Sequence, residues 1–96
     1  MKMLFIIYDV DFDEDVMDML AALSVTGYTK WGRVLGKGVR SQPKLDDAVW
    51  PGFNCAVMIA LKKEDEPSVF KALEDLHRQM GEKGLKVFSW PLERVI

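Results

Sequence analysis

The chain has 96 residues, with 13 lysines and arginines against 15 aspartates and glutamates, so its formal net charge is −2. This length corresponds to one domain, residues 1–96, which buries only about 60–65% of its unfolded surface and therefore often needs association with further copies. The acidic balance argues against nucleic-acid binding, and the single Cys55 excludes a disulfide framework. The short apolar N-terminal run is neither a membrane span nor a signal peptide, so we expect a cytoplasmic protein without membrane insertion.

The first half of the chain predicts a strand, a helix and a second strand. The apolar and aromatic run at residues 3–10 has the length of a strand. Apolar residues of the segment 16–23 recur at i, i+4 and i+7, which places them on one helical face. Asp13 is positioned to cap this helix and Gly27 to end it in a left-handed conformation. Residues 28–35 then form the second predicted strand.

The second half repeats this plan. Residues 53–61 form an apolar strand, and Pro67 follows two acidic residues at a position that the first turn of a helix tolerates. The apolar stripe of this helix consists of Val69, Leu73, Leu76 and Met80. Gly81 ends the helix, and residues 85–90 form the last strand. Two β-α-β units in succession predict an α+β fold of the ferredoxin-like βαββαβ type, with a long connection between the second and third strands.

The first and third predicted strands are apolar on both faces. Residues 4–7 are all apolar or aromatic, as are residues 55–60, whereas a strand with one wet face alternates apolar and polar residues. In a ferredoxin-like fold both helices cover the same sheet face. Another copy of the chain is the simplest cover for the other face, although twist and long side chains hide such a face in some monomers.

An acidic cluster around residues 9–18 resembles the start of a calcium loop. The resemblance ends at Glu14, which occupies the glycine position of that motif, and at Leu20, which replaces its bidentate glutamate. Acidic residues are also favoured at a helix N-terminus by the helix dipole, so we interpret the cluster as a solvated helix start.

No catalytic or metal-binding constellation can be named from the sequence. His77 is the only histidine and has no second histidine or cysteine at ligand spacing. Cys55 lies in a strand without a nearby base. The three tryptophans could stack on bases, but the negative net charge favours packing or subunit contact for Trp31, Trp50 and Trp90. We therefore predict a protein that is not an enzyme.

The most distinctive segment is residues 26–45, which contain no acidic residue and intersperse glycines with cations. The cations are Lys30, Arg33, Lys37, Arg40 and Lys44. Its second part opens a connection at residues 36–52 that is far longer than a hairpin turn, and loops of that length are often functional. A second glycine- and lysine-containing turn lies at residues 81–86. Together these turns suit one anion pocket, while each alone also suits an ordinary solvated loop.

Several of these features resemble the nitrogen-regulatory PII signal-transduction proteins and their PII-like relatives. The final K-V-F-S-W-P-L-E-R-V-I (residues 86–96) is similar to the last strand of the family, and V-T-G-Y-T (residues 25–29) to its turn into the second strand. Gly36-Lys37-Gly38, followed by Arg40, resembles the start of the family's large T-loop. The turn M-G-E-K-G-L-K is one residue shorter than the family's B-loop and lacks its aspartate, and the T-loop segment has no tyrosine. These differences favour a PII-like relative over a nitrogen sensor of the usual kind.

The resemblance implies a non-enzymatic homotrimeric regulator that binds an adenine nucleotide (ATP, ADP or AMP) in clefts between subunits. The 36–52 loop would then contact a partner protein. The residues implied in nucleotide or anion binding are Gly36, Lys37, Gly38, Arg40, Gly81, Gly84 and Lys86. The alternative is a PII-like trimer that senses a metal or another metabolite without binding a nucleotide.

Overall fold

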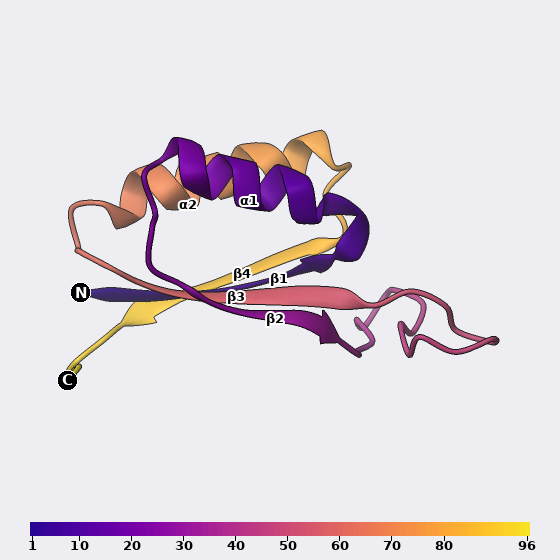
Figure 1. Cartoon of the computed structure of the whole chain (residues 1–96). Helices are drawn as coiled ribbons and strands as arrows, with labels where there is room; N and C mark the ends of the chain where they lie inside the picture. Colours follow the sequence, from indigo (N-terminus) through magenta and orange to yellow (C-terminus); the bar gives the residue numbers. More distant parts are fainter.

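The computed structural model describes residues 1–96 and places two helices side by side on one face of a four-stranded sheet (Figure 1). Its elements, in chain order, are β1 (Lys2–Asp9), η1 (Val10–Phe12), α1 (Asp13–Ala22), β2 (Thr29–Val34), β3 (Asn54–Leu61), α2 (Glu66–Gln79) and β4 (Leu85–Pro91). Every strand pair is antiparallel, in the order β2-β3-β1-β4. The predicted α+β ferredoxin-like fold is therefore confirmed.

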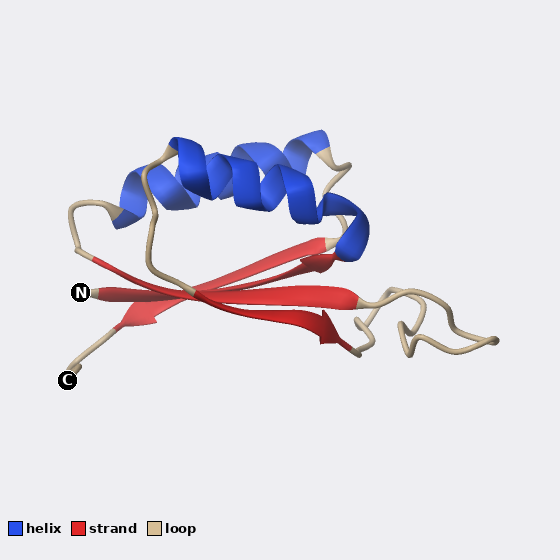
Figure 2. Ribbon diagram, viewed as in Figure 1, coloured by secondary structure: helices blue, strands red, loops and turns tan.

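The connection between β2 and β3 is the main departure from a simple sandwich. It extends beyond the end of the sheet, away from both chain termini (Figure 2). The turn from α2 into β4 lies at the same end, where β1 and β4 pair from Tyr8 and Leu85 onward. The two glycine-containing segments identified in the sequence are thereby brought to one end of the molecule.

The core lies between the helices and the sheet. On β1 every second residue is buried, namely Leu4, Ile6 and Tyr8, as expected for a strand with one face against the helices. Their β3 partners in the register are Ile59, Val57 and Cys55, all buried as well. The helices contribute Val16, Leu20, Val69 and Leu73.

The opposite sheet face is apolar and partly open to solvent. The remaining residues of β1 pair with β3 as Met3 with Ala60, Phe5 with Met58 and Ile7 with Ala56. The edge strands add Trp31, Phe88 and Trp90, whose exposed fractions are 43%, 45% and 42%. The Phe5 and Trp31 rings lie 5.9 Å apart between centroids. We call this surface the open sheet face; both faces of the central strands are apolar, as the sequence predicted.

The two ends of α1 differ from the prediction. Asp13 is the first helical residue and does not cap the helix, because its carboxylate is bonded to Tyr8 and Lys30 instead. The left-handed residue after α1 is Ser24, with φ 61°, and not Gly27. Leu23 follows the helix and is 37% exposed, so it does not belong to the buried stripe. The predicted end of α2 is confirmed, since Gly81 adopts φ 77° directly after the C-cap.

Candidate anion-binding site

The long β2–β3 connection is divided into two lobes by a backbone bridge. The Gly36 N–H donates to the Lys44 carbonyl at 2.9 Å, and the Lys44 N–H donates back to the Gly36 carbonyl at 2.7 Å. This reciprocal pair closes residues 37–43 into a proximal lobe, which carries Lys37 and Arg40 and no acidic residue.

Residues 45–52 form a distal lobe with its own hydrogen bonds. The Asp46 N–H donates to the Gly52 carbonyl at 3.0 Å, and Gly52 adopts φ 88°. The Asp47 carboxylate accepts from the backbone N–H groups of Val49 and Trp50, at 3.0 and 2.6 Å. Arg33 of β2 pairs with Asp46 at 2.6 Å. The distal lobe is therefore organised by its own hydrogen bonds and by one ion pair with β2.

A cleft of about 730 Å³ lies between the proximal lobe and the first residues of β4. All of the residues predicted to bind an anion except Gly81 line it: Gly36, Lys37, Gly38, Arg40, Gly84 and Lys86. Gly81 lies outside this lining, at the end of α2, where its positive φ serves the helix end. The fold thus brings together cations that lie more than forty residues apart in the sequence.

Two glycines of the cleft, Gly84 and Gly38, lie in turns that are closely packed against neighbouring side chains. Gly84 has φ 80°, and a Cβ there would lie 3.1 Å from the Phe12 ring. Its carbonyl accepts from the Asp9 N–H at 2.9 Å, which fixes the turn against the end of β1. A Cβ on Gly38 would lie 2.5 Å from the Ser41 hydroxyl oxygen, which accepts from the Gly38 N–H. At Gly84 the positive φ disfavours any residue with a Cβ, whereas at Gly38 the only close atom is the end of the Ser41 side chain.

Two further lining residues, Lys44 and Asn54, were not among the site residues predicted from the sequence. The Lys44 ammonium lies 2.5 Å from the Asp9 carboxylate and donates to the Asn54 side-chain carbonyl at 3.2 Å. By contrast, Lys37 donates only to the neighbouring Gly38 carbonyl. Arg40 and Lys86 form no ion pair. The cleft therefore contains three cations without a carboxylate partner and one cation that is neutralised.

The electrostatics of Asp9 reflect this pairing. Burial pushes the pKa of the Asp9 carboxyl upward, but the hydrogen bonds from Lys44 and from the Asp11 N–H outweigh burial and hold this pKa below its ordinary value. Asp9 is consequently ionised at neutral pH. The same carboxylate accepts from Asp11 at 2.9 Å and so caps η1.

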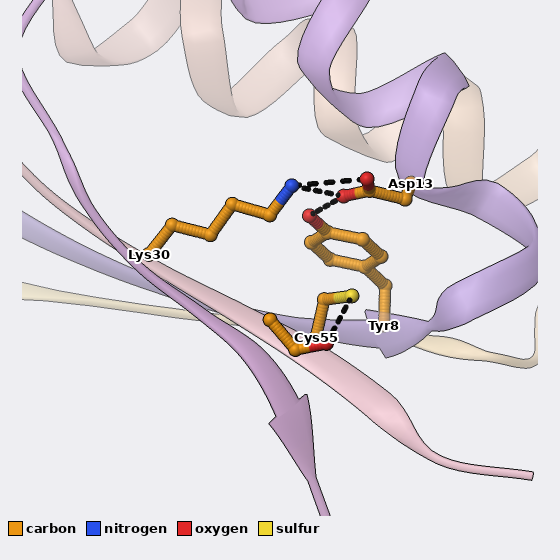
Figure 3. A network of polar contacts seen from close by, with 5 residues as sticks. Tyr8, Asp13, Lys30 and Cys55 are labelled. Atoms are coloured by element: carbon orange, nitrogen blue, oxygen red, sulfur yellow. Dashed lines mark hydrogen bonds and ion pairs between the residues drawn. The ribbon is translucent and has the colours of Figure 1, made fainter.

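A second polar network lies between the sheet and α1, on the face of the sheet that the helices cover (Figure 3). The Tyr8 hydroxyl donates to Asp13 at 2.6 Å, and Lys30 reaches the two oxygens of the same carboxylate at 2.8 and 2.9 Å. The Cys55 thiol donates to the Gly32 carbonyl at 3.4 Å, where the pairing of β2 with β3 is interrupted by a shift in register. The network joins β1, β2, β3 and α1.

The pKa shifts in this network follow from burial and charge. Burial, together with the Asp13 carboxylate, raises the pKa of the Tyr8 hydroxyl, and burial next to Asp13 raises that of the Cys55 thiol. Burial also acts to raise the Asp13 pKa, but Lys30 and Tyr8 outweigh it and lower this pKa. Tyr8 and Cys55 are therefore protonated at neutral pH, which suits structural roles.

The other features considered from the sequence do not form a site within the chain. No group of three or more histidine, cysteine, aspartate or glutamate side chains converges in a way that could hold a metal ion. Neither helix has the length and apolar character that crossing a bilayer requires. Trp31 and Trp90 lie on edge strands at opposite sides of the sheet, and Trp50 lies in the distal lobe, so the tryptophans do not form one stacking platform.

Comparison with known proteins identifies similar chains. The sequence profile of the family described as nitrogen regulatory protein P-II matches residues 1–96. No protein of curated function matches the sequence. Similar solved structures include CPII from Thiomonas intermedia K12, a nitrogen regulatory PII-like protein, in its apo form. That structure has 18% identity and a TM-score of 0.70, over 93% of this chain and 85% of the other.

Two further solved structures have the same fold. CPII bound to ADP, AMP and bicarbonate has 23% identity and a TM-score of 0.70, over 93% of this chain and 82% of its own. A PII-like signalling protein from Thermus thermophilus has 16% identity and a TM-score of 0.67, over 93% of this chain and 83% of its own. At these identities the structural likeness shows the fold, while the profile match over the whole chain shows the family.

Proposed function

The chain belongs to the nitrogen regulatory protein P-II family, and from this membership we propose that it is a non-enzymatic PII-like regulator whose effector is an anion bearing phosphate groups, with an adenine nucleotide as the leading candidate. The observation that carries the proposal is the convergence of Lys37, Arg40 and Lys86 on one cleft without carboxylate partners. Cations from two loops with glycine-containing turns suit phosphate oxygens. The complexes of CPII with ADP, AMP and bicarbonate support a ligand of this kind.

The proposed active assembly is a homotrimer. The open sheet face exposes Trp31, Phe88 and Trp90, and burial of apolar surface is the main driving force for association. The cleft adjoins this face, because Phe88 also lines it. A neighbouring subunit that covers the open sheet face would therefore approach the cleft and complete its wall.

The proposed output is a change in how the distal lobe engages a partner protein. This lobe projects beyond the sheet end, and Val49 in it is 73% exposed. Trp50 beside it is 36% exposed and is the kind of side chain that anchors protein interfaces. An effector bound between the proximal lobe and β4 can bias the orientation of the distal lobe only if it binds one orientation more tightly than another.

Isothermal titration of the purified protein with ATP, ADP, AMP and cyclic nucleotides tests the effector. We expect at least one adenine nucleotide to bind more tightly than about 1 mM, which corresponds to about −4 kcal/mol. Adenosine is the matched control, since it carries the base without phosphate and should bind more weakly. If no phosphate-bearing nucleotide binds below the millimolar range, the nucleotide proposal is wrong.

A second candidate is a PII-like trimer that senses a small metabolite anion, such as bicarbonate, without binding a nucleotide. The specific observation in its favour is the turn M-G-E-K-G-L-K, which lacks the aspartate of the family B-loop. Titration with bicarbonate in the absence of nucleotide distinguishes the two candidates. Saturable bicarbonate binding together with no response to ATP, ADP or AMP would favour the second.

A further inference from the structure

Lys44 differs from the other cations of the cleft because three parts of the fold contact it. Its backbone closes the proximal lobe through Gly36, and its ammonium contacts Asp9 at the end of β1 and Asn54 at the start of β3. The Lys44 and Asp9 side chains are only 25% and 21% exposed, so solvent screens this pair less than the other ion pairs of the chain. Lys44 and Asn54 line the cleft, whereas Asp9 does not.

An ammonium group has three N–H donors, and two of them are used here. One donates to Asp9 and one to Asn54, which leaves a third for a ligand in the cleft. An anion bound to that donor shares the nitrogen with the Asp9 carboxylate. The two negative charges then repel each other and divide the attraction of a single positive charge.

We propose that Lys44 is a further anion-binding group of this cleft and that Asp9 is a built-in competitor for it. The inference rests on the proposed function, since it assumes that the cleft takes a phosphate-bearing anion. Asp9 lowers the affinity of the site for such an anion. In return, a bound anion weakens the contact between Asp9 and Lys44, because linkage acts equally in both directions.

This competition gives the effector a direct route to the distal lobe. Lys44 is the last residue of the bridge with Gly36, and Leu45, which follows it, begins the distal lobe. Weakening the contact between Lys44 and Asp9 removes the interaction that holds this junction to β1. The remaining contact with Asn54 keeps the junction attached to β3.

The test compares affinities in a double-mutant cycle, with ADP and inorganic pyrophosphate as probes in isothermal titrations. Asp9→Asn keeps a side-chain oxygen that can cap η1 but removes the competing charge, and we expect it to tighten binding by roughly twofold to fivefold. Asp11→Asn is the matched control, because it changes the net charge equally and Asp11 does not contact Lys44. Lys44→Met should weaken binding, and Asp9→Asn should have no effect in the Lys44→Met background.

The outcomes separate the inference from the function on which it rests. If the wild type binds neither ADP nor pyrophosphate, both are overturned. If the wild type binds and Asp9→Asn has the same affinity as Asp11→Asn, the competition is wrong while the proposed function stands. The competition is likewise wrong, and the proposed function stands, if Asp9→Asn tightens binding as much in the Lys44→Met background as in the wild type. Thermal unfolding of each variant verifies that it is folded. If Lys44→Met does not fold, Asn54→Ala perturbs the position of Lys44 independently.

Discussion

The buried Tyr8 hydroxyl donates a 2.6 Å hydrogen bond to Asp13, the first residue of α1. Tyr8 is only 1% exposed, and the Asp13 carboxylate also holds Lys30 of the edge strand β2. One carboxylate therefore connects the central strand, the first helix and the strand from which the long loop departs. This arrangement replaces the helix cap that the sequence predicted for Asp13.

Removing the Tyr8 hydroxyl should destabilise the fold without changing its core. In Tyr8→Phe the ring remains, but Asp13 loses one hydrogen bond, so we expect a loss of about 1 kcal/mol in the free energy of unfolding. Urea unfolding at pH 7 measures it. Tyr28→Phe is the control, since Tyr28 is 47% exposed and makes no side-chain hydrogen bond. Equal stabilities of the two variants would contradict a role for the Tyr8 contact.

Stability should fall on acidification, in a window set by the paired carboxylates. The pKa values of Asp9 and Asp13 are lower in the folded chain than their ordinary value of 3.8, so protonation favours the unfolded state. Their contribution is fully present well above pH 3.8 and is lost as the pH falls through the folded pKa. Urea midpoints measured from pH 7 to pH 3 verify this. Asp13→Asn should flatten the profile, and an unchanged profile would exclude Asp13.

A charge on the open sheet face should prevent association of the chain. We expect wild type at micromolar concentration to scatter light as a particle of about three times its 11.0 kDa mass. Phe88→Glu should shift it to a monomer, because a carboxylate buried without a partner is strongly unfavourable. Val49→Glu, in the exposed distal lobe, is the control and should leave the mass unchanged. A monomeric wild type would refute the proposed assembly.

Lys86 should contribute to binding any phosphate-bearing effector. A hydrogen bond between charged groups is worth about 1.5–3 kcal/mol, so Lys86→Ala should weaken the affinity by roughly tenfold or more. Lys83→Ala, in the same turn but outside the cleft lining, changes the net charge equally and should have little effect. Titrations with ADP measure both. Equal affinities of the two variants would remove Lys86 from the site.

The fold of the distal lobe should depend on Asp47. Asp47→Ala removes the acceptor for the Val49 and Trp50 N–H groups, so their amide hydrogens should exchange faster with solvent. Asp47→Asn retains an acceptor oxygen and should preserve most of the protection. Amide exchange followed by NMR reports each residue. Slow exchange at Trp50 in the alanine variant would show that other contacts hold the lobe.

The sequence predicts the elements of this fold well because the signal for each is local. The apolar runs of β1 and β3 and the helical stripe of α2 are periodic patterns that the structure confirms. The prediction failed at the end of α1. There Ser24 rather than Gly27 takes the left-handed conformation, although glycine adopts it at lower cost.

The candidate site was only partly predictable from the sequence. Glycines and cations in two turns indicated a site of seven residues, and the fold brings all of them except Gly81 to one cleft: Gly36, Lys37, Gly38, Arg40, Gly84 and Lys86. Lys44 and Asn54 were not assigned to the site, because the Lys44 side chain is held by Asp9 and Asn54, which lie in other parts of the sequence. No pattern of spacing contains that information.

The bridge between Gly36 and Lys44 has a consequence for how such a protein can diversify. It turns one long connection into two short closed segments, and the entropy of closing each depends only on its own length. Residues 45–52 can therefore be lengthened, shortened or exchanged for those of a relative without altering the segment that faces the cleft. The two proposed functions, recognition of a partner and recognition of an effector, would then evolve separately, and grafted chimeras of the two segments should fold.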